Sequence, residues 1–273
     1  MLNGILMYAL AMNLAAVAVY IAASGYLINL LRGRQPLDGP WVHALALTAV
    51  AFHWSGLYPL LFGADGVNFS FFATASLVCA AINSLLLLSG LRKPVHTLYL
   101  LLMPLSAASI LMLLIFHNHA HFTPLGDGLA VHVVLSLLAY SLLTIATAQA
   151  LILAFQTHQL KNHQTGGAVR ILPPLQTMEA LLFDVLWLGF ALLTAALASG
   201  FVFVEDLLGQ HLAHKTVFSI LAWLIYASLL AGRHFLGWRG HTAVRFTLGG
   251  FAALMLAYFG SKFVLELVLG INS

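Results

Sequence analysis

The chain has 273 residues, of which 62% are hydrophobic and only 7% charged, and its mean hydropathy is +0.98. A soluble domain carries about 25% charged residues, so this chain cannot cover a water-facing surface and lipid must be the solvent for much of it. The net charge of +3 gives no basis for a nucleic-acid partner, and a single cysteine, Cys79, excludes an internal disulfide and a CxxC motif.

Eight apolar windows are each long enough for a helix to cross the hydrocarbon core, which takes about 20 residues. They are Ile5–Leu31, Pro40–Phe62, Phe69–Leu91, Val95–Phe116, Leu129–Thr157, Ala180–Val204, Thr216–Arg233 and Ala243–Leu269. The breaks between them are short and carry Gly, Pro or charge. No barrel-type alternation is present, so helices must satisfy the backbone. We predict an all-α, polytopic transmembrane bundle of about eight helices, forming a single membrane domain over residues 1–273.

The basic residues predict how the bundle is oriented. They follow the odd-numbered windows, as Arg32, Arg34, Arg92, Lys93, Lys161, Arg170, Arg233, Arg239 and Arg245. Because Lys and Arg accumulate in cytoplasmic loops, the odd loops should be cytoplasmic and both termini non-cytoplasmic. The expected location is a bacterial-type cytoplasmic (inner) membrane, with the lipid bilayer as the first partner.

The longest polar stretch, His158–Thr177, follows the fifth window and is expected to continue into an interfacial helical turn through Gln176–Glu179. Glu179 and Asp184 follow it, five residues apart. We interpret both carboxylates as boundary residues or as partners of the nearby arginines, with a proton-relay role as the alternative.

Histidine is the one abundant polar residue, with 13 copies. His53 lies deep in the second window, while His132 and His214 lie near the outer ends of the fifth and seventh. These three can converge in the outer half of the bundle, where two imidazoles could ligate a haem iron. Aromatic residues that could line an apolar macrocycle are Trp54, Tyr58, Tyr140, Phe218, Trp223 and Tyr226.

Each histidine also has a structural interpretation. His53 could be a buried imidazole bonded to a serine or a backbone carbonyl of a neighbouring helix, and His132 and His214 could be interfacial residues. The trio His117, His119 and His121 is expected to be a solvated loop or a weak surface metal site. Six further histidines are assigned to the cytoplasmic side, where we expect them to be surface residues of a positively charged face. They are His43, at the cytoplasmic start of the second window, and His96, His158, His163, His234 and His241.

Three stretches of the second half carry a family resemblance. They are His132-Val-Val-Leu-Ser-Leu-Leu-Ala-Tyr140-Ser, then Pro174-Leu-Gln-Thr-Met-Glu179 with Leu188-Gly-Phe-Ala-Leu-Leu-Thr194, and finally Trp223-Leu-Ile-Tyr226, Gly237-Trp238-Arg239-Gly240 and Tyr258-Phe259-Gly260. In order and spacing they resemble the cytochrome c assembly family of CcsA/CcmC type, and its YpjD-like inner-membrane branch most closely, over about residues 130–265. The first half is similar mainly in hydropathy and in carrying His53.

The resemblance implies a protein that handles haem at the outer membrane face, with His132 in the place of an outer axial ligand and His53 as a membrane-embedded histidine. One departure is large. The family's tryptophan-rich outer loop of WGxxWxWD type is replaced by Val204–Lys215, which has no tryptophan. Two further histidines of the family are also missing here, since their expected positions fall near Ala231 and Leu269. These differences argue against cytochrome c ligation itself and leave enzymatic activity open, and they make His214 a candidate replacement ligand.

The sequence therefore predicts a membrane protein that holds non-covalent, b-type haem with His53, His132 and His214 as candidate iron ligands and Trp54, Tyr140 and Trp223 as lining residues. Which two histidines form the pair stays open. Other membrane proteins are a further class of partner that this function allows. The alternatives are a small-solute or proton transporter gated by His53, a non-enzymatic membrane scaffold, and a redox enzyme with haem as an electron carrier.

Overall fold

The computed structural model describes residues 2–33, 37, 39–64, 66–116, 122–163, 171–203, 213–260 and 262–263. Within these residues eight helices are long and apolar enough to cross a membrane. The predicted all-α transmembrane class is thus confirmed, and the helices begin within a few residues of the windows that predicted them. The orientation of the two termini stays a prediction.

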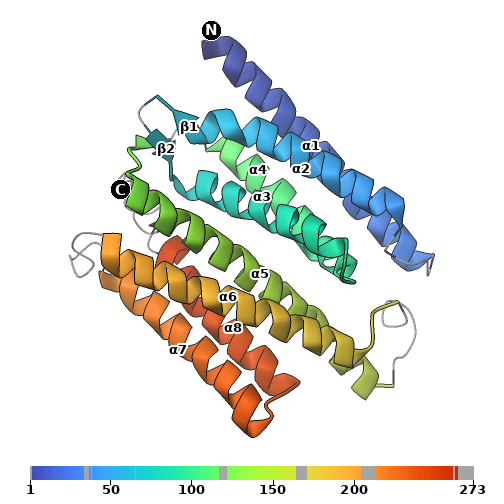
Figure 1. The fold of residues 1–273 in the computed structure, drawn as a ribbon. Helices are drawn as coiled ribbons and strands as arrows, with labels where there is room; N and C mark the ends of the chain where they lie inside the picture. The colour runs from blue at the N-terminus through green and yellow to red at the C-terminus, as the bar shows by residue number, and fades with distance from the viewer. Residues whose placement is uncertain are drawn as a thin grey trace. The chain divides into compact units, whose positions relative to one another are not determined.

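The helices follow one another with short connections (Figure 1). Their bounds are α1 Leu2–Arg32, α2 Pro40–Leu61, α3 Phe71–Gly90, α4 Tyr99–Ile115, α5 Asp127–Lys161, α6 Leu175–Phe203, α7 Ala213–Leu236 and α8 His241–Met255. A 3₁₀ turn, η1 His96–Leu98, precedes α4, and a π-helical turn, η4 Leu256–Gly260, continues α8. The predicted interfacial turn over Gln176–Glu179 is not separate, because these residues form the start of α6.

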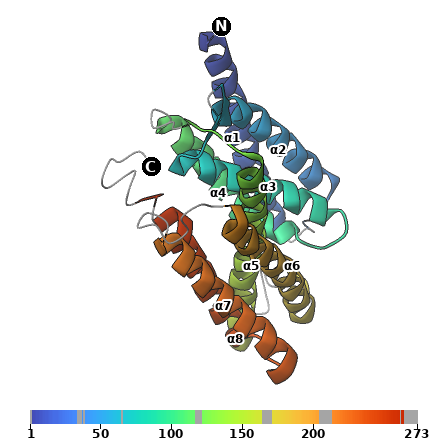
Figure 2. The same cartoon turned by 60° about the vertical axis from the view of Figure 1, so that its left-hand side comes forward.

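The chain divides into two compact units, one holding α1–α4 (unit 1) and the other α5–α8 (unit 2). In each unit, consecutive helices pack against each other and the first packs against the last, which gives two four-helix bundles of the same connectivity (Figures 1 and 2). No internal repeat is visible in the sequence, so the two units share topology without recognisable sequence similarity. A single membrane domain over residues 1–273 stays a prediction.

Unit 1 also contains a small antiparallel sheet that the sequence did not predict. It consists of β1 Phe62–Gly63, β2 Gly66–Asn68 and β3 Phe122–Thr123 in that order. Gly66 has a φ of +134°, and a Cβ there would lie 2.2 Å from the carbonyl oxygen of Thr123. Only glycine can therefore occupy this position. The strands are too short for periodicity to reveal them.

Unit 2 is built on a close approach of α5 and α6. Gly189 faces Leu143, where a Cβ would lie 2.9 Å from the leucine side chain, and Gly128 faces the ring of Phe203. Small residues let transmembrane helices come close enough for extensive van der Waals packing. The core between the four helices of unit 2 then fills with alanine, leucine and one fully buried tyrosine, Tyr226.

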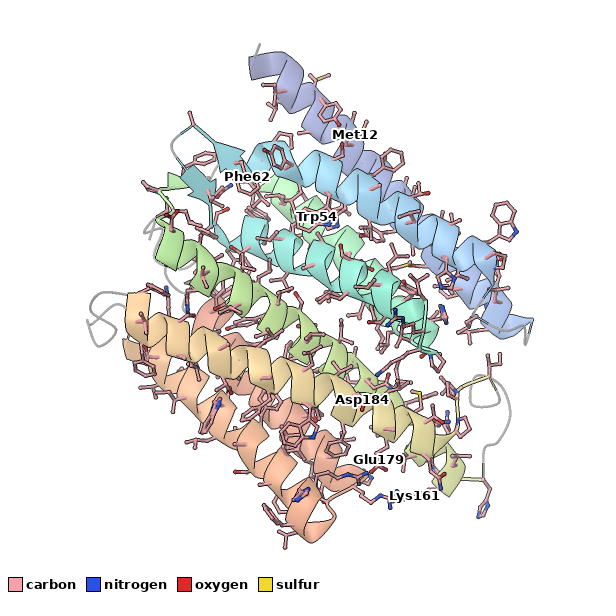
Figure 3. All side chains as sticks on the ribbon, viewed as in Figure 1. Met12, Trp54, Phe62, Lys161, Glu179 and Asp184 are labelled. Atoms are coloured by element: carbon pink, nitrogen blue, oxygen red, sulfur yellow. The ribbon has the colours of Figure 1, made fainter. Side chains whose placement is uncertain are left out.

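A charged cluster fastens the α7–α8 turn to the start of α6. Glu179 accepts hydrogen bonds from Arg233 at 2.9 Å and from Arg239 at 3.2 Å, which confirms the interpretation of this carboxylate as an arginine partner. The Arg233 guanidinium also lies 4.6 Å from the ring centroid of Phe183. Figure 3 shows Glu179 beside this turn.

Replacing Glu179 by alanine should lower the free energy of unfolding by about 1–3 kcal/mol, because two arginines would face each other without the carboxylate between them. Glu179→Gln keeps the shape and one acceptor oxygen and should lose less. Detergent-to-SDS titrations followed by tryptophan fluorescence measure both variants. An alanine variant as stable as the parent chain would show that the cluster contributes nothing to stability.

Candidate functional site

The predicted site residues are divided between the two units. His53 and Trp54 lie on α2 in unit 1, whereas His132 and Tyr140 on α5, and His214 and Trp223 on α7, belong to unit 2.

His53 is fully buried between three helices of unit 1. Its Nδ1 lies 3.2 Å from the hydroxyl of Tyr20 on α1, and its Nε2 lies 2.9 Å from the hydroxyl of Ser76 on α3. Both ring nitrogens are therefore engaged, and the imidazole ties α1, α2 and α3 together. This is the hydrogen-bonded arrangement of its structural interpretation. Ligation of iron by His53 would require breaking one of these bonds, and its role as a ligand stays a prediction.

Trp54, the next residue, ties α2 to α3. Its indole N–H donates to the hydroxyl of Ser84 at 3.0 Å, and that hydroxyl donates in turn to the Ala80 carbonyl. The side chain is half-buried and lies between the two helices (Figure 3). Trp54 is predicted to line a haem site, and in the structure its hydrogen bond joins α2 to α3.

His132, in the second turn of α5, packs against α6 in unit 2. Its Nδ1 lies 3.0 Å from the carbonyl oxygen of Ala196 and 3.2 Å from the hydroxyl of Ser199. Among the described residues, its Nε2 has one long contact, 3.4 Å, to the hydroxyl of Ser136 one turn further along α5. The ring rests on Gly200, where an added Cβ would lie 3.1 Å from Cε1.

These contacts fix the protonation pattern of His132. A carbonyl oxygen only accepts hydrogen bonds, so Nδ1 must carry the proton that it donates to Ala196. In the neutral ring Nε2 then keeps its lone pair. A histidine that ligates a metal almost always donates its other N–H to a carbonyl or carboxylate, which sets the tautomer and the ring orientation. His132 has the arrangement that metal ligation through Nε2 requires.

His214 lies in the first turn of α7 and is half-buried. The start of α5, the end of α6 and the start of α7 lie at one end of unit 2 (Figure 1). The structure therefore brings His132 and His214 to the same end of this four-helix bundle.

Tyr140 and Trp223 make further contacts between helices of unit 2. The Tyr140 hydroxyl donates to the Leu254 carbonyl at 2.6 Å, just before the π-helical turn η4, whose altered backbone pairing frees carbonyl oxygens. Trp223 donates to the Thr194 hydroxyl at 2.9 Å and stacks on Phe190. These hydrogen bonds and this ring contact join neighbouring helices and go to partners other than His132.

The immediate surroundings of His132 are the residues that the sequence did not identify. Ser136 lies on the same face of α5, one turn away, and Ser199 and Gly200 come from α6. The signals were present: a serine four residues after the histidine, and a Ser-Gly pair near the end of an apolar helix, which allows close approach. That Ser199 and Gly200 contact His132 depends on the packing of α5 against α6, which the sequence alone does not predict.

The loop trio His117, His119 and His121 lies outside the described residues, as does most of the altered loop that begins at Val204. Within the described part of the chain, no group of three or more His, Cys, Asp or Glu side chains is placed to hold a metal ion.

Comparison with known proteins shows which family this chain is similar to. The profile of the family described as "Cytochrome C assembly protein" matches residues 41–269, so the similarity begins well before the expected residue 130. Inner membrane protein YpjD of Escherichia coli K12 is 31% identical over 266 residues, which cover 94% of this chain and all of YpjD. Cytochrome c biogenesis protein CcsA of Chlamydomonas reinhardtii is 25% identical over 52% of this chain and 39% of its own. No solved structure matches significantly.

The eight apolar helices and the full-length similarity to an inner membrane protein identify the chain as an integral protein of the inner membrane. The profile match covers most of the sequence and includes the described part of all four helices of unit 2. The chain belongs to the cytochrome c assembly protein family.

Proposed function

We propose that this protein binds haem non-covalently and handles it for cytochrome c assembly, with His132 as an axial ligand of the iron. The observation that carries the proposal is the N–H of His132 Nδ1 donating to the Ala196 carbonyl at 3.0 Å. It leaves Nε2 with its lone pair, and in the part of the chain that the structure describes this atom is contacted by the Ser136 hydroxyl at 3.4 Å. Family membership supports haem as the group that is bound.

His214 is the proposed second ligand. It lies at the same end of unit 2 as His132, and the sequence that precedes it replaces the tryptophan-rich loop typical of the family. His53 has less support in this role because both of its nitrogens are hydrogen-bonded within unit 1. Two imidazoles would hold the iron in a six-coordinate, low-spin state.

Without the tryptophan-rich loop, a haem-binding accessory role fits this chain better than a complete cytochrome c synthetase. The relatives named for cytochrome c biogenesis share only part of their length with it, 39% for the algal CcsA. The residues of this chain would bind the haem, orient it through a fixed imidazole and exclude water with an apolar bundle. Haem itself would supply the iron centre that is stored or passed on.

Absorption spectra of the detergent-purified protein, supplemented with haem and recorded oxidised and dithionite-reduced, test the proposal. The parent chain should show a sharp reduced α-band. His132→Ala should weaken that band at least tenfold or convert the haem to a high-spin form, and His214→Ala should convert it to a high-spin form. His158→Ala, at the other end of the same helix α5, is the matched control and should leave the spectrum unchanged.

Ser136→Ala sharpens the test because it removes the group that contacts Nε2 of His132. It should leave haem binding intact or strengthen it. A featureless spectrum of the supplemented parent chain would reject haem binding, and a spectrum that His132→Ala leaves unchanged would reject His132 as the ligand.

A second candidate function, proton or small-solute transport, is favoured by one observation in unit 1. The fully buried Tyr20, His53 and Ser76 form a continuous hydrogen-bonded chain across three helices, and buried ionisable groups in membrane spans often mark transport paths. Proton flux into proteoliposomes, with His53→Ala as the comparison, measures this activity. Flux that is equal in both proteins and in empty vesicles would exclude it.

A further inference from the structure

Unit 1 contains a second pair of histidines, placed at the end where α2 begins and α3 ends. His43 lies in the first turn of α2 and His96 opens the 3₁₀ turn η1, 53 residues later. Their Nε2 atoms are 3.0 Å apart. His96 is buried and His43 is half-buried. The sequence predicted that both are surface residues of a positively charged cytoplasmic face, whereas the structure brings them into contact with each other.

We propose that His43 and His96 form a binding site for a divalent transition-metal ion, with Zn²⁺ and Cu²⁺ as the preferred class. The geometry is that of two ligands in adjacent positions. An ion about 2.1 Å from both nitrogens would subtend an angle of about 90° between them, and rings aimed at it would have centroids about 4.6 Å apart. The ring centroids are separated by 4.6 Å, and the ring planes are inclined by 72°.

The same geometry can be compared with two other arrangements of a histidine pair. Axial ligands of one haem iron lie on opposite sides of the porphyrin, so their nitrogens are about 4 Å apart along one line. A straight N–H···N hydrogen bond of this length would separate the ring centroids by about 5.3 Å. The pair is too close for the first arrangement, and its 3.0 Å contact is a hydrogen bond that is bent rather than straight, which a bound ion would replace.

The surroundings supply a third ligand atom. The carbonyl oxygen of Gly90, the last residue of α3, lies 3.3 Å from Nε2 of His43. A Cβ on Gly90 would be 3.5 Å from both Nε2 atoms, so a larger residue at this position would contact both histidines. In the same segment, the buried hydroxyls of Thr97 and Tyr99 have no hydrogen-bond partner among the described residues.

The donor set indicates which metals fit. Imidazole nitrogen is a good ligand for Zn²⁺, Cu²⁺ and Ni²⁺, and Cu²⁺ binds most strongly along the first-row series. Hard ions such as Ca²⁺ and Mg²⁺ need several oxygen ligands and are not matched. This end of unit 1 carries the loops predicted to be cytoplasmic. The site would therefore sample the metal ions of that compartment, independently of haem binding in unit 2.

Calorimetric titration with Zn²⁺ tests the site on the full chain, purified with a tag free of histidine and with His117, His119 and His121 replaced by alanine to silence the loop trio. One ion should bind per chain. His43→Ala and His96→Ala should each weaken binding at least tenfold. His234→Ala, an exposed histidine on α7, is the matched control and should have no effect.

Electron paramagnetic resonance of bound Cu²⁺, in the chain that lacks the loop histidines, gives a second measurement. It leaves His43 and His96 unaltered. Bound Cu²⁺ should show hyperfine coupling to two imidazole nitrogens. Absence of Zn²⁺ binding, binding that survives the His43→Ala/His96→Ala double variant, or Cu²⁺ without nitrogen coupling would each overturn the proposal.

Discussion

Replacement of His53 by alanine is expected to lower the free energy of unfolding by about 2–4 kcal/mol, because it opens a cavity and leaves two buried hydroxyl groups without a partner. The imidazole is fully buried and joins Tyr20 of α1 to Ser76 of α3. Individual hydrogen bonds between transmembrane helices average only about 0.6 kcal/mol, so most of the loss comes from the cavity. Unfolding in mixed micelles with increasing SDS, followed by tryptophan fluorescence, measures it.

Tyr20→Phe and Ser76→Ala are the matched controls for this prediction. Each removes one partner and keeps the imidazole, so each should cost less than His53→Ala. The folded fraction of the His53→Ala protein should keep its haem spectrum, since His132 and His214 are the proposed ligands. Normal stability together with loss of haem would contradict the structural role and make His53 an iron ligand.

Gly56→Ala is expected to lower the free energy of unfolding by about 2–4 kcal/mol through overpacking between α1 and α2. A Cβ at this position would lie 2.7 Å from the backbone nitrogen of Asn13 and equally close to its side-chain Cγ. Asn13 is fully buried and held by a hydrogen bond to the Ala9 carbonyl, so it cannot move aside without shifting α1. The same SDS titration detects the loss as an earlier transition.

Gly25→Ala is the control, because Gly25 lies on an exposed face of α1 with no atom within 4 Å of the added Cβ. Alanine favours the helix over glycine by about 1 kcal/mol, so this variant should be as stable as the parent chain or more stable. Equal behaviour of the two variants would show that the approach of α1 to α2 at Gly56 is not tight.

The sequence by itself determined the class of the protein and its membrane helices. Eight apolar windows gave eight helices because a backbone in hydrocarbon must satisfy its own hydrogen bonds, and length and hydropathy then leave few alternatives. The stretches around His132, Glu179 and Trp238 also indicated the family, which the profile match over residues 41–269 confirms. The sequence offered arginine as a partner of Glu179 beside its interpretation as a boundary residue, and the structure confirms the arginine contacts.

Only the tertiary structure decided what each histidine touches. His53 and His132 look alike in sequence, as single imidazoles in apolar helices, yet the first has both nitrogens engaged and the second presents one. His43 and His96 are 53 residues apart and meet through the packing around the end of α3. Helix formation is local and follows from the solvent, whereas the partners of a side chain depend on which helix faces are paired. Small residues such as Gly56 and Gly200 set that pairing, and their role becomes visible only in contact.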